Sequence, residues 1–168
     1  SSLSNGQISG IKKQQVTTEL QIFKDHLPGD QVANLKHHGG SDRVIHHYSN
    51  IQYNHFKKIF PEYADRFVPG SFGENITTED LTEIHLCIGD IFKLGTALVQ
   101  VTEPRNPCGT IDSNYEIKGV LKEVLKSRKY GWFYRILEEG TLKVGDYLEL
   151  VERPHPELNL DKLIYELK

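Results

Sequence analysis

The loop around Cys108 has the residue types most suited to chemistry in this 168-residue chain. It reads Glu103-Pro104-Arg105-Asn106-Pro107-Cys108-Gly109, so two prolines stiffen the backbone on either side of a cation. Arg105 favours the thiolate form of Cys108, which is the form that binds metals and attacks electrophiles. Taken alone, Cys108 is either such a reactive thiol or a small apolar residue in a loop.

The second cysteine, Cys87, differs in its surroundings. It lies inside an alternating apolar pattern, and no His or Cys stands nearby at a metal-binding spacing. We therefore interpret Cys87 as a structural residue, and we expect both thiols to be free rather than bridged.

A second candidate segment covers residues 29–43. It places Lys36, His37, His38 and Arg43 around the pair Gly39-Gly40. Backbone N–H groups of a glycine turn, together with Lys and Arg, favour binding of phosphate or another anion. The spacing is not that of a Walker loop. The alternative is a polar hairpin loop without a ligand.

A third segment, Pro69-Gly70-Ser71-Phe72-Gly73-Glu74-Asn75-Ile76, is rich in turn residues. Gly70 and Gly73 permit a tight backbone, and Asn75 offers both a donor and an acceptor. The same residues are also typical of a simple turn between a helix and a strand.

Five histidines raise the question of zinc: His37, His38, His46, His47 and His55. The chain has neither a His-Glu-x-x-His nor a Cys-x-x-Cys motif, and adjacent histidines on a strand point to opposite faces. We do not favour a zinc site.

The elements that carry the first two segments are predicted to be mainly strands. Residues 6–24 mix apolar and polar residues like a pair of strands, and residues 43–48 predict another. A helix is expected near residues 49–60, begun by a capping box of Ser49 and Gln52 and ended by Pro61.

The second half of the chain shows short alternating segments and one strongly periodic helix. Alternation over residues 81–89, 92–94, 97–101, 132–137 and 147–151 predicts strands between glycine turns. Apolar residues at helical spacing predict a helix near 116–129 with Gly131 just past its end, and another helix begins near Leu158.

The composition is that of an ordinary globular protein, with 38% hydrophobic and 26% charged residues. A formal net charge of −3 argues against non-specific nucleic-acid binding. Because no apolar run has the ~20 residues that a membrane helix needs, and no signal-peptide pattern is seen, we expect a cytoplasmic protein without membrane or nucleic-acid partners.

The three loop segments occur in the order Lys-His-His-Gly-Gly, Phe-Gly-Glu-Asn and Pro-Arg-Asn-Pro-Cys. This order resembles the MOSC family, named for the C-terminal domain of molybdenum-cofactor sulfurase, and in particular its bacterial YiiM-like branch. The resemblance covers roughly residues 29–152. It implies a mainly β fold, a small β-barrel with peripheral helices over residues 1–153, followed at 154–168 by the start of a C-terminal helical domain.

The resemblance also implies a molybdenum-pyranopterin cofactor whose metal is bound by Cys108. Soft thiolate suits this metal, and cations suit the pterin's phosphate. The residues expected to bind the cofactor are Lys36, His38, Gly39, Arg43, Gly73, Asn75, Arg105 and Cys108. Besides Cys108, either His37 or His38 is expected to act in catalysis, as a proton donor.

Family resemblance implies reduction of N-hydroxylated compounds, such as N-hydroxylated base analogues. Nothing in the sequence resembles a flavin, haem or iron–sulfur site, so a separate electron-donor protein is expected. Two alternatives stay open: a sulfur-carrier or cofactor-delivery module that acts through Cys108 without redox turnover, and a binding domain without any reaction.

Overall fold

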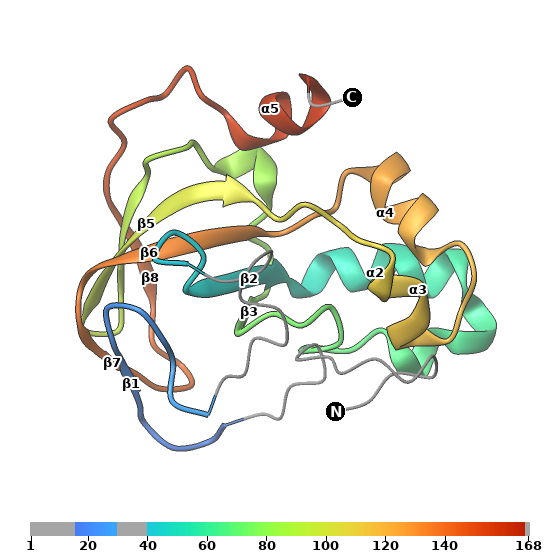
Figure 1. The fold of residues 1–168 in the computed structure, drawn as a ribbon, viewed down its shortest axis with the longest axis horizontal. Coiled ribbons are helices and arrows are strands. Elements are labelled where there is room, and N and C mark those ends of the chain that lie inside the picture. Colours follow the sequence, from blue (N-terminus) through green and yellow to red (C-terminus); the bar gives the residue numbers. More distant parts are fainter. Residues whose placement is uncertain (1–15, 30–39, 167–168) are drawn as a thin grey trace.

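A curled six-stranded sheet forms the centre of the fold (Figure 1). The computed structural model describes residues 16–29 and 40–166. The strand order is β3-β2-β6-β5-β4-β8, and only β2 and β3 run parallel. The strands are β2 (Ile45–Ser49), β3 (Ile76–Thr78), β4 (Ile91–Leu94), β5 (Ala97–Pro104), β6 (Trp132–Glu138) and β8 (Leu148–Glu152).

A small second sheet extends one end of the first. It pairs β1 (Leu20–Ile22) with β7 (Gly140–Leu142), and Thr96 N donates to Thr141 O at 2.9 Å to join it to the β4–β5 turn. The prediction for residues 6–24 is confirmed at β1, while residues 6–15 lie outside the described residues.

The main core lies inside the curl of the sheet because the strands alternate between buried and less buried side chains. Ala97, Val99 and Val101 of β5 are buried, and so are Trp132 and Tyr134 of the neighbouring β6. This packing confirms the predicted mainly β architecture, with the sheet curled into a half-barrel whose edge strands are β3 and β8.

Helices α2 (Asn50–Ile59), η1 (Pro61–Arg66), α3 (Thr110–Tyr115) and α4 (Val120–Ser127) gather around a second, aromatic core. The short helices η2 (Glu83–His85) and α5 (Leu160–Glu166) lie apart from it, and Leu160 and Ile164 of α5 pack in the main core. Figure 1 shows α2, α3 and α4 at one end of the sheet, away from β1 and β7. Tyr48, Tyr53, Phe56, Phe72 and Tyr115 pack together beneath them. No helix among the described residues is long and apolar enough to cross a bilayer.

Two predicted helices need different corrections. The helix near 49–60 is confirmed as α2, but its capping box is wrong, because Ser49 Oγ donates to Glu79 O at 3.2 Å instead. The helix near 116–129 is shorter, because Glu116 and Gly119 have positive φ and α4 starts only at Val120. It ends at Ser127, and the left-handed residue that follows it is Arg128, with a φ of 59°, and not Gly131.

The predicted strand over residues 81–89 is wrong. The chain forms the 3₁₀ turn η2 there, and Cys87 makes a single bridge with Asn159. Polar groups explain the difference: the Glu83 carboxylate points inward to backbone N–H groups, and Asp90 Oδ2 accepts from Cys87 N at 2.8 Å. Of the alternating apolar residues, Leu86 is buried, whereas Ile84 is 61% exposed.

His47 of β2 is a neutral residue of the core. Its Nδ1 lies 3.0 Å from Tyr134 Oη and its Nε2 lies 2.8 Å from Thr78 Oγ1. Burial lowers the pKa of His47 to about 3, so the ring stays neutral in the folded protein at pH values where the unfolded chain protonates it.

We expect this histidine to make folding sensitive to acid. Below the unfolded pKa of about 6.5, protonation of the unfolded chain costs about 1.4 kcal/mol of stability per pH unit, until the pH reaches the folded value. Urea unfolding at about pH 7.5 and about pH 5 should show wild-type protein losing about 2 kcal/mol more than His47→Gln. Equal losses in both proteins would contradict a neutral His47.

Candidate functional site

Cys108 lies in the loop between β5 and α3, half-buried and free of any disulfide. Its Sγ is 2.8 Å from Thr110 Oγ1, and its carbonyl oxygen accepts from Ile111 N at 3.1 Å as the first turn of α3 forms. The thiol is therefore held in place from both sides of the residue and remains partly accessible. Thr110 is a site residue that the sequence reasoning missed.

Cys87, unlike Cys108, is not accessible to a ligand. It is buried, its Sγ donates to Pro156 O at 3.5 Å, and burial raises the pKa of its thiol. A buried protonated thiol is a poor nucleophile and metal ligand, which agrees with the structural role predicted for it.

The Arg105 side chain brings a positive charge close to Cys108. Burial lowers the pKa of Arg105, while electrostatic interactions with Cys108, Tyr48, Tyr115 and Glu74 oppose that effect. Within the part of the chain that the structure describes, the guanidinium makes neither an ion pair nor a hydrogen bond. A desolvated cation without a counter-ion is costly, and an anionic ligand would offset that cost.

A buried carboxylate, Glu74, lies in the same electrostatic environment as Arg105. Its Oε1 accepts from Tyr53 Oη at 2.5 Å, Gly70 N at 2.7 Å and Thr77 Oγ1 at 3.1 Å. Its Oε2 is buried and has no partner among the described residues. Glu74 belongs to the third predicted segment, but sequence reasoning selected its neighbours Gly73 and Asn75.

Tyr115, the last residue of α3, closes the aromatic side of the site. Its hydroxyl is 2.6 Å from Ser71 Oγ, and burial raises its pKa well above the ordinary value. The hydroxyl therefore stays protonated at neutral pH. It ties α3, the helix that follows the Cys108 loop, to the Gly70–Gly73 turn of the third predicted segment.

A second buried carboxylate, Glu83, supports the Cys108 loop through Gly131, whose backbone contacts both Glu83 and Arg105. It accepts hydrogen bonds from Tyr130 N at 3.0 Å, Gly131 N at 2.8 Å and the Gln52 amide. Gly131 O in turn accepts from Arg105 N at 3.0 Å. Glu83 is 3% exposed, and burial raises its pKa. Sequence reasoning missed it because its partners are 31 to 48 residues away.

Gly131 is required at this point of the chain. Its φ is 73°, and a Cβ there would lie 2.6 Å from His47 O. An L-amino acid with a side chain would meet both strain and a clash. The residue predicted to follow a helix thus serves to bring Arg105 close to β2.

Of the other predicted site residues, Arg43 lies in the described structure, whereas four others do not. Lys36, His37, His38 and Gly39 lie outside the described residues, so their roles stay predictions. Arg43 forms a two-bonded ion pair with Glu103 of β5, at 2.6 and 3.0 Å.

Asn75 and Gly73 contact the backbone near β2. Asn75 Oδ1 accepts from His46 N at 2.8 Å, and Asn75 N donates to His46 O at 2.7 Å. Gly73 has a φ of 81° and closes the turn by donating to Gly70 O at 3.0 Å. These contacts explain local folding, and cofactor binding by either residue stays a prediction.

Within residues 16–29 and 40–166, no group of three or more His, Cys, Asp or Glu side chains is arranged to hold a metal ion. His47 is buried in the core beside the Tyr134 hydroxyl, and His55 Nε2 lies 2.7 Å from Glu123 Oε1, so both imidazoles already have protein partners. Any metal at Cys108 therefore needs most of its ligands from outside these residues.

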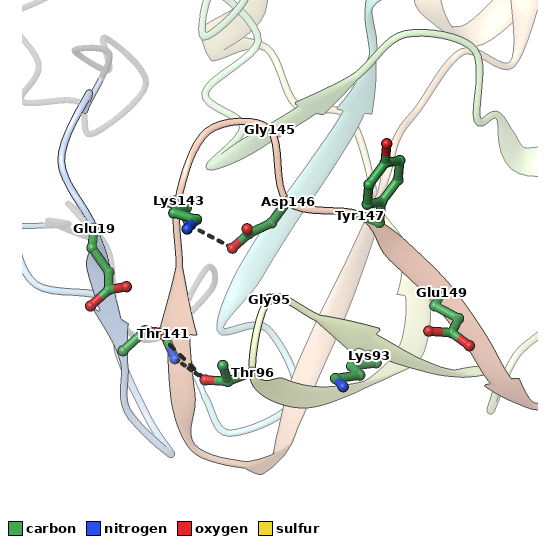
Figure 2. Close-up of a pocket in the computed structure, with 10 residues that line it drawn as sticks. All are labelled: Glu19, Lys93, Gly95, Thr96, Thr141, Lys143, Gly145, Asp146, Tyr147 and Glu149. Carbon is green, nitrogen blue, oxygen red and sulfur yellow. Dashed lines mark hydrogen bonds between the residues drawn. The ribbon is translucent and has the colours of Figure 1, made fainter.

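A hollow of about 400 Å³ lies at the opposite end of the sheet (Figure 2). It is formed by β1, the β4–β5 turn and the β7–β8 loop, where Lys143 N donates to Asp146 Oδ2 at 2.9 Å. Charges of both signs, including Lys93 and Glu149, line it. None of the predicted site residues is among the lining residues, so we do not assign the site to this hollow.

Fold and site together define a β half-barrel domain with a half-buried cysteine, Cys108, on a loop that follows a strand, close to the half-buried cation of Arg105. The family model for the MOSC domain matches residues 34–149. The chain belongs to the MOSC domain family.

Several relatives extend this assignment. Protein YiiM of Escherichia coli is 40% identical over 148 residues, which cover 88% of this chain and 66% of YiiM. A protein named Reductase from Gibberella moniliformis is 34% identical over 93% of this chain, but only 28% of that protein is matched. The chain thus spans about two thirds of the length of E. coli YiiM.

Solved structures show the same fold. The crystal structure of YiiM from Escherichia coli superposes with a TM-score of 0.81 at 34% identity, covering 90% of this chain and 71% of that one. YiiM from Geobacillus stearothermophilus gives 0.81 at 31% identity, covering 95% and 74%. These likenesses confirm the predicted family and fold.

Loss of the Glu83 carboxylate should loosen the support of Arg105. We expect Glu83→Ala to lower the free energy of unfolding by about 3 kcal/mol, because two buried N–H groups and the Gln52 amide lose their acceptor. Glu83→Gln keeps an acceptor oxygen and should lose about 1 kcal/mol. Urea unfolding measures both, with the exposed Glu79→Ala as control. A Glu83→Ala loss no larger than that of the control would contradict this role.

Proposed function

We propose that this chain is a molybdenum-cofactor-binding oxidoreductase that reduces N-hydroxylated compounds with electrons from a separate redox protein. The observation that carries the proposal is a half-buried, disulfide-free Cys108 close to the half-buried Arg105 side chain, which forms no ion pair or hydrogen bond among the described residues. Membership of the MOSC family and the relative named Reductase support this reading.

The residues of the site fit such a group. Cys108 offers one soft thiolate, which suffices where a dithiolene supplies other ligands. Arg105 offers a charge without a partner in the described chain to an anionic part of the cofactor. Lys36, His38, Gly39, Arg43, Gly73 and Asn75 complete the proposed binding set. When bound, the cofactor supplies the two electrons that reduce an N–O bond.

The chain's own residues then orient groups and hold protons. The Thr110 hydroxyl, at 2.8 Å, fixes the Cys108 sulfur and can donate a hydrogen bond to its thiolate. Reduction of N–OH to N–H releases water and consumes two protons along with the two electrons. We propose His37 or His38 as the proton donor, since an imidazole exchanges protons near neutral pH.

Metal analysis of protein expressed in a host that makes the cofactor tests the ligand assignment. We expect near-stoichiometric molybdenum in wild type and in the control Cys87→Ala, and a loss of about tenfold or more in Cys108→Ser, because a hydroxyl is a much poorer ligand for a soft metal. Molybdenum retained by Cys108→Ser would refute Cys108 as the ligand.

Turnover is tested separately, with an N-hydroxylated purine and dithionite as reductant. Protein that holds molybdenum yet yields no reduced purine would favour cofactor delivery over reduction. A persulfide on Cys108, detected by mass spectrometry, would favour the sulfur-carrier alternative.

Arg105→Gln should separate stability from cofactor binding. Removing a desolvated cation without a counter-ion should leave the melting temperature of cofactor-free protein unchanged or higher. Cofactor retention should fall about tenfold or more, since a charged hydrogen bond contributes about 1.5–3 kcal/mol. The measurements are thermal unfolding and the fluorescence of oxidised pterin released from purified protein. Unchanged pterin retention would remove Arg105 from the site.

A further inference from the structure

The surface shared by α2 and α4 has an unusual charge. The two helices are joined by His55 Nε2 and Glu123 Oε1 at 2.7 Å. Residues 116–129 hold five Lys or Arg against two Glu, and α2 has two Lys and no acidic residue, although the whole chain has a net charge of −3. Glu123, the one acidic residue of α4, already contacts His55.

We call this surface the basic helical face. It is defined by exposed residues on or next to the two helices: Lys58, Ile59, Lys118, Lys122, Leu125 and Lys126. Ile59 is 47% exposed and Leu125 is 43% exposed. The four lysine side chains make no ion pair or hydrogen bond within residues 16–29 and 40–166. Unpaired lysines gathered on one surface are suited to contact an acidic partner.

The basic helical face adjoins the Cys108 loop through Asp112 of α3. Asp112 Oδ2 accepts from Gly119 N at 3.0 Å, and its Oδ1 accepts from Leu121 N at 2.7 Å, so it caps the start of α4. Asp112 is four residues after Cys108. Figure 1 shows α3 and α4 following directly from the end of β5. A partner on this face would therefore sit beside the candidate site.

We propose that the basic helical face docks an acidic one-electron carrier protein, which delivers electrons to the site at Cys108. This proposal rests on the proposed function. Two reduced carriers each lose one electron; the N–OH group takes up both electrons and two protons, its N–O bond breaks, and N–H and water form. The carrier's acidic surface complements the lysines, while the net negative charge of the remaining surface disfavours docking elsewhere.

A protein partner agrees with this face better than a nucleic acid or a membrane. Single-stranded nucleic acids need several exposed aromatic side chains for stacking. Among the described residues one exposed aromatic side chain, Tyr165, lies next to α4, and its ring already packs against the Arg128 guanidinium at 5.0 Å. Membrane-surface helices bury a broad apolar side, whereas here two partly exposed apolar residues stand among lysines.

The docking proposal is tested by reversing two lysine charges on the basic helical face and comparing carrier binding with that of a variant that reverses two lysine charges elsewhere. The variant is Lys122→Glu/Lys126→Glu. The matched control is Lys93→Glu/Lys143→Glu, at the hollow of Figure 2. The probes are a purified acidic [2Fe–2S] ferredoxin and an acidic flavodoxin, with affinity measured by calorimetry at about 20 mM and about 200 mM salt. This binding assay needs no molybdenum in the protein.

We expect wild type and control to bind at least one carrier at low salt and to weaken as salt rises. The face variant should bind about tenfold or more weakly at low salt. Equal weakening in both variants, or no binding of either carrier by wild type, would overturn the proposal. Tighter binding of wild type to a DNA oligonucleotide or to anionic lipid vesicles than to either carrier would also overturn it.

Turnover then separates this inference from the proposed function. With molybdenum-loaded protein, reduction of the N-hydroxylated purine driven by the carrier should fall about tenfold in the face variant, while reduction driven by dithionite should stay unchanged. A face variant that retains full carrier-driven turnover would overturn the docking proposal. Absent turnover with both reductants, alongside binding that the face variant loses, would refute the proposed reaction and leave the docking surface standing.

Discussion

The burial of the Glu83 carboxylate is the constraint on which the arrangement of the site depends. A carboxylate removed from water must be satisfied by hydrogen bonds, and here the donors come from α2 and from the segment that leads into β6. Satisfying Glu83 therefore sets where α2 lies relative to the sheet. It also orients Gly131, whose carbonyl oxygen holds the backbone of Arg105. The 3₁₀ turn η2, the aromatic core and the Cys108 loop are thus positioned by one charged group.

Elements whose residues alternate or repeat locally were predictable from the sequence. The antiparallel pair β4–β5, strand β6 and helix α2 follow from local patterns, and so does the position of Cys108 after a strand. Residues 84–88 show how such a pattern misleads, because Glu83 and Asp90 bind backbone N–H groups and force a turn. Glu74 and Thr110 could not be selected either, since their roles depend on three-dimensional neighbours. In a single sequence, a buried carboxylate looks like any surface glutamate.

The site contains two polar groups that lower the stability of the folded protein because they are withdrawn from water without a full set of partners. Arg105 carries a partly desolvated charge that no described carboxylate contacts directly, and Glu74 has one buried oxygen that no described residue contacts. Tyr53 and Tyr115 stay neutral beside them, because burial raises the pKa of each hydroxyl. Such costs are found where a protein is organised around a ligand rather than for stability alone. The electrostatics of the site and the family assignment therefore point in the same direction.

The half-open sheet has a further consequence at its outer strand. In the described part of the sheet β8 pairs with β4 alone, so its other edge presents backbone groups that a second molecule could extend. Leu150 and Val151 are exposed on this strand, a composition that favours aggregation. Glu149 and Glu152 flank them, and antiparallel pairing of two such edges would bring like charges together. These two glutamates act as gatekeepers that keep separate molecules of a β-rich protein from joining edge to edge.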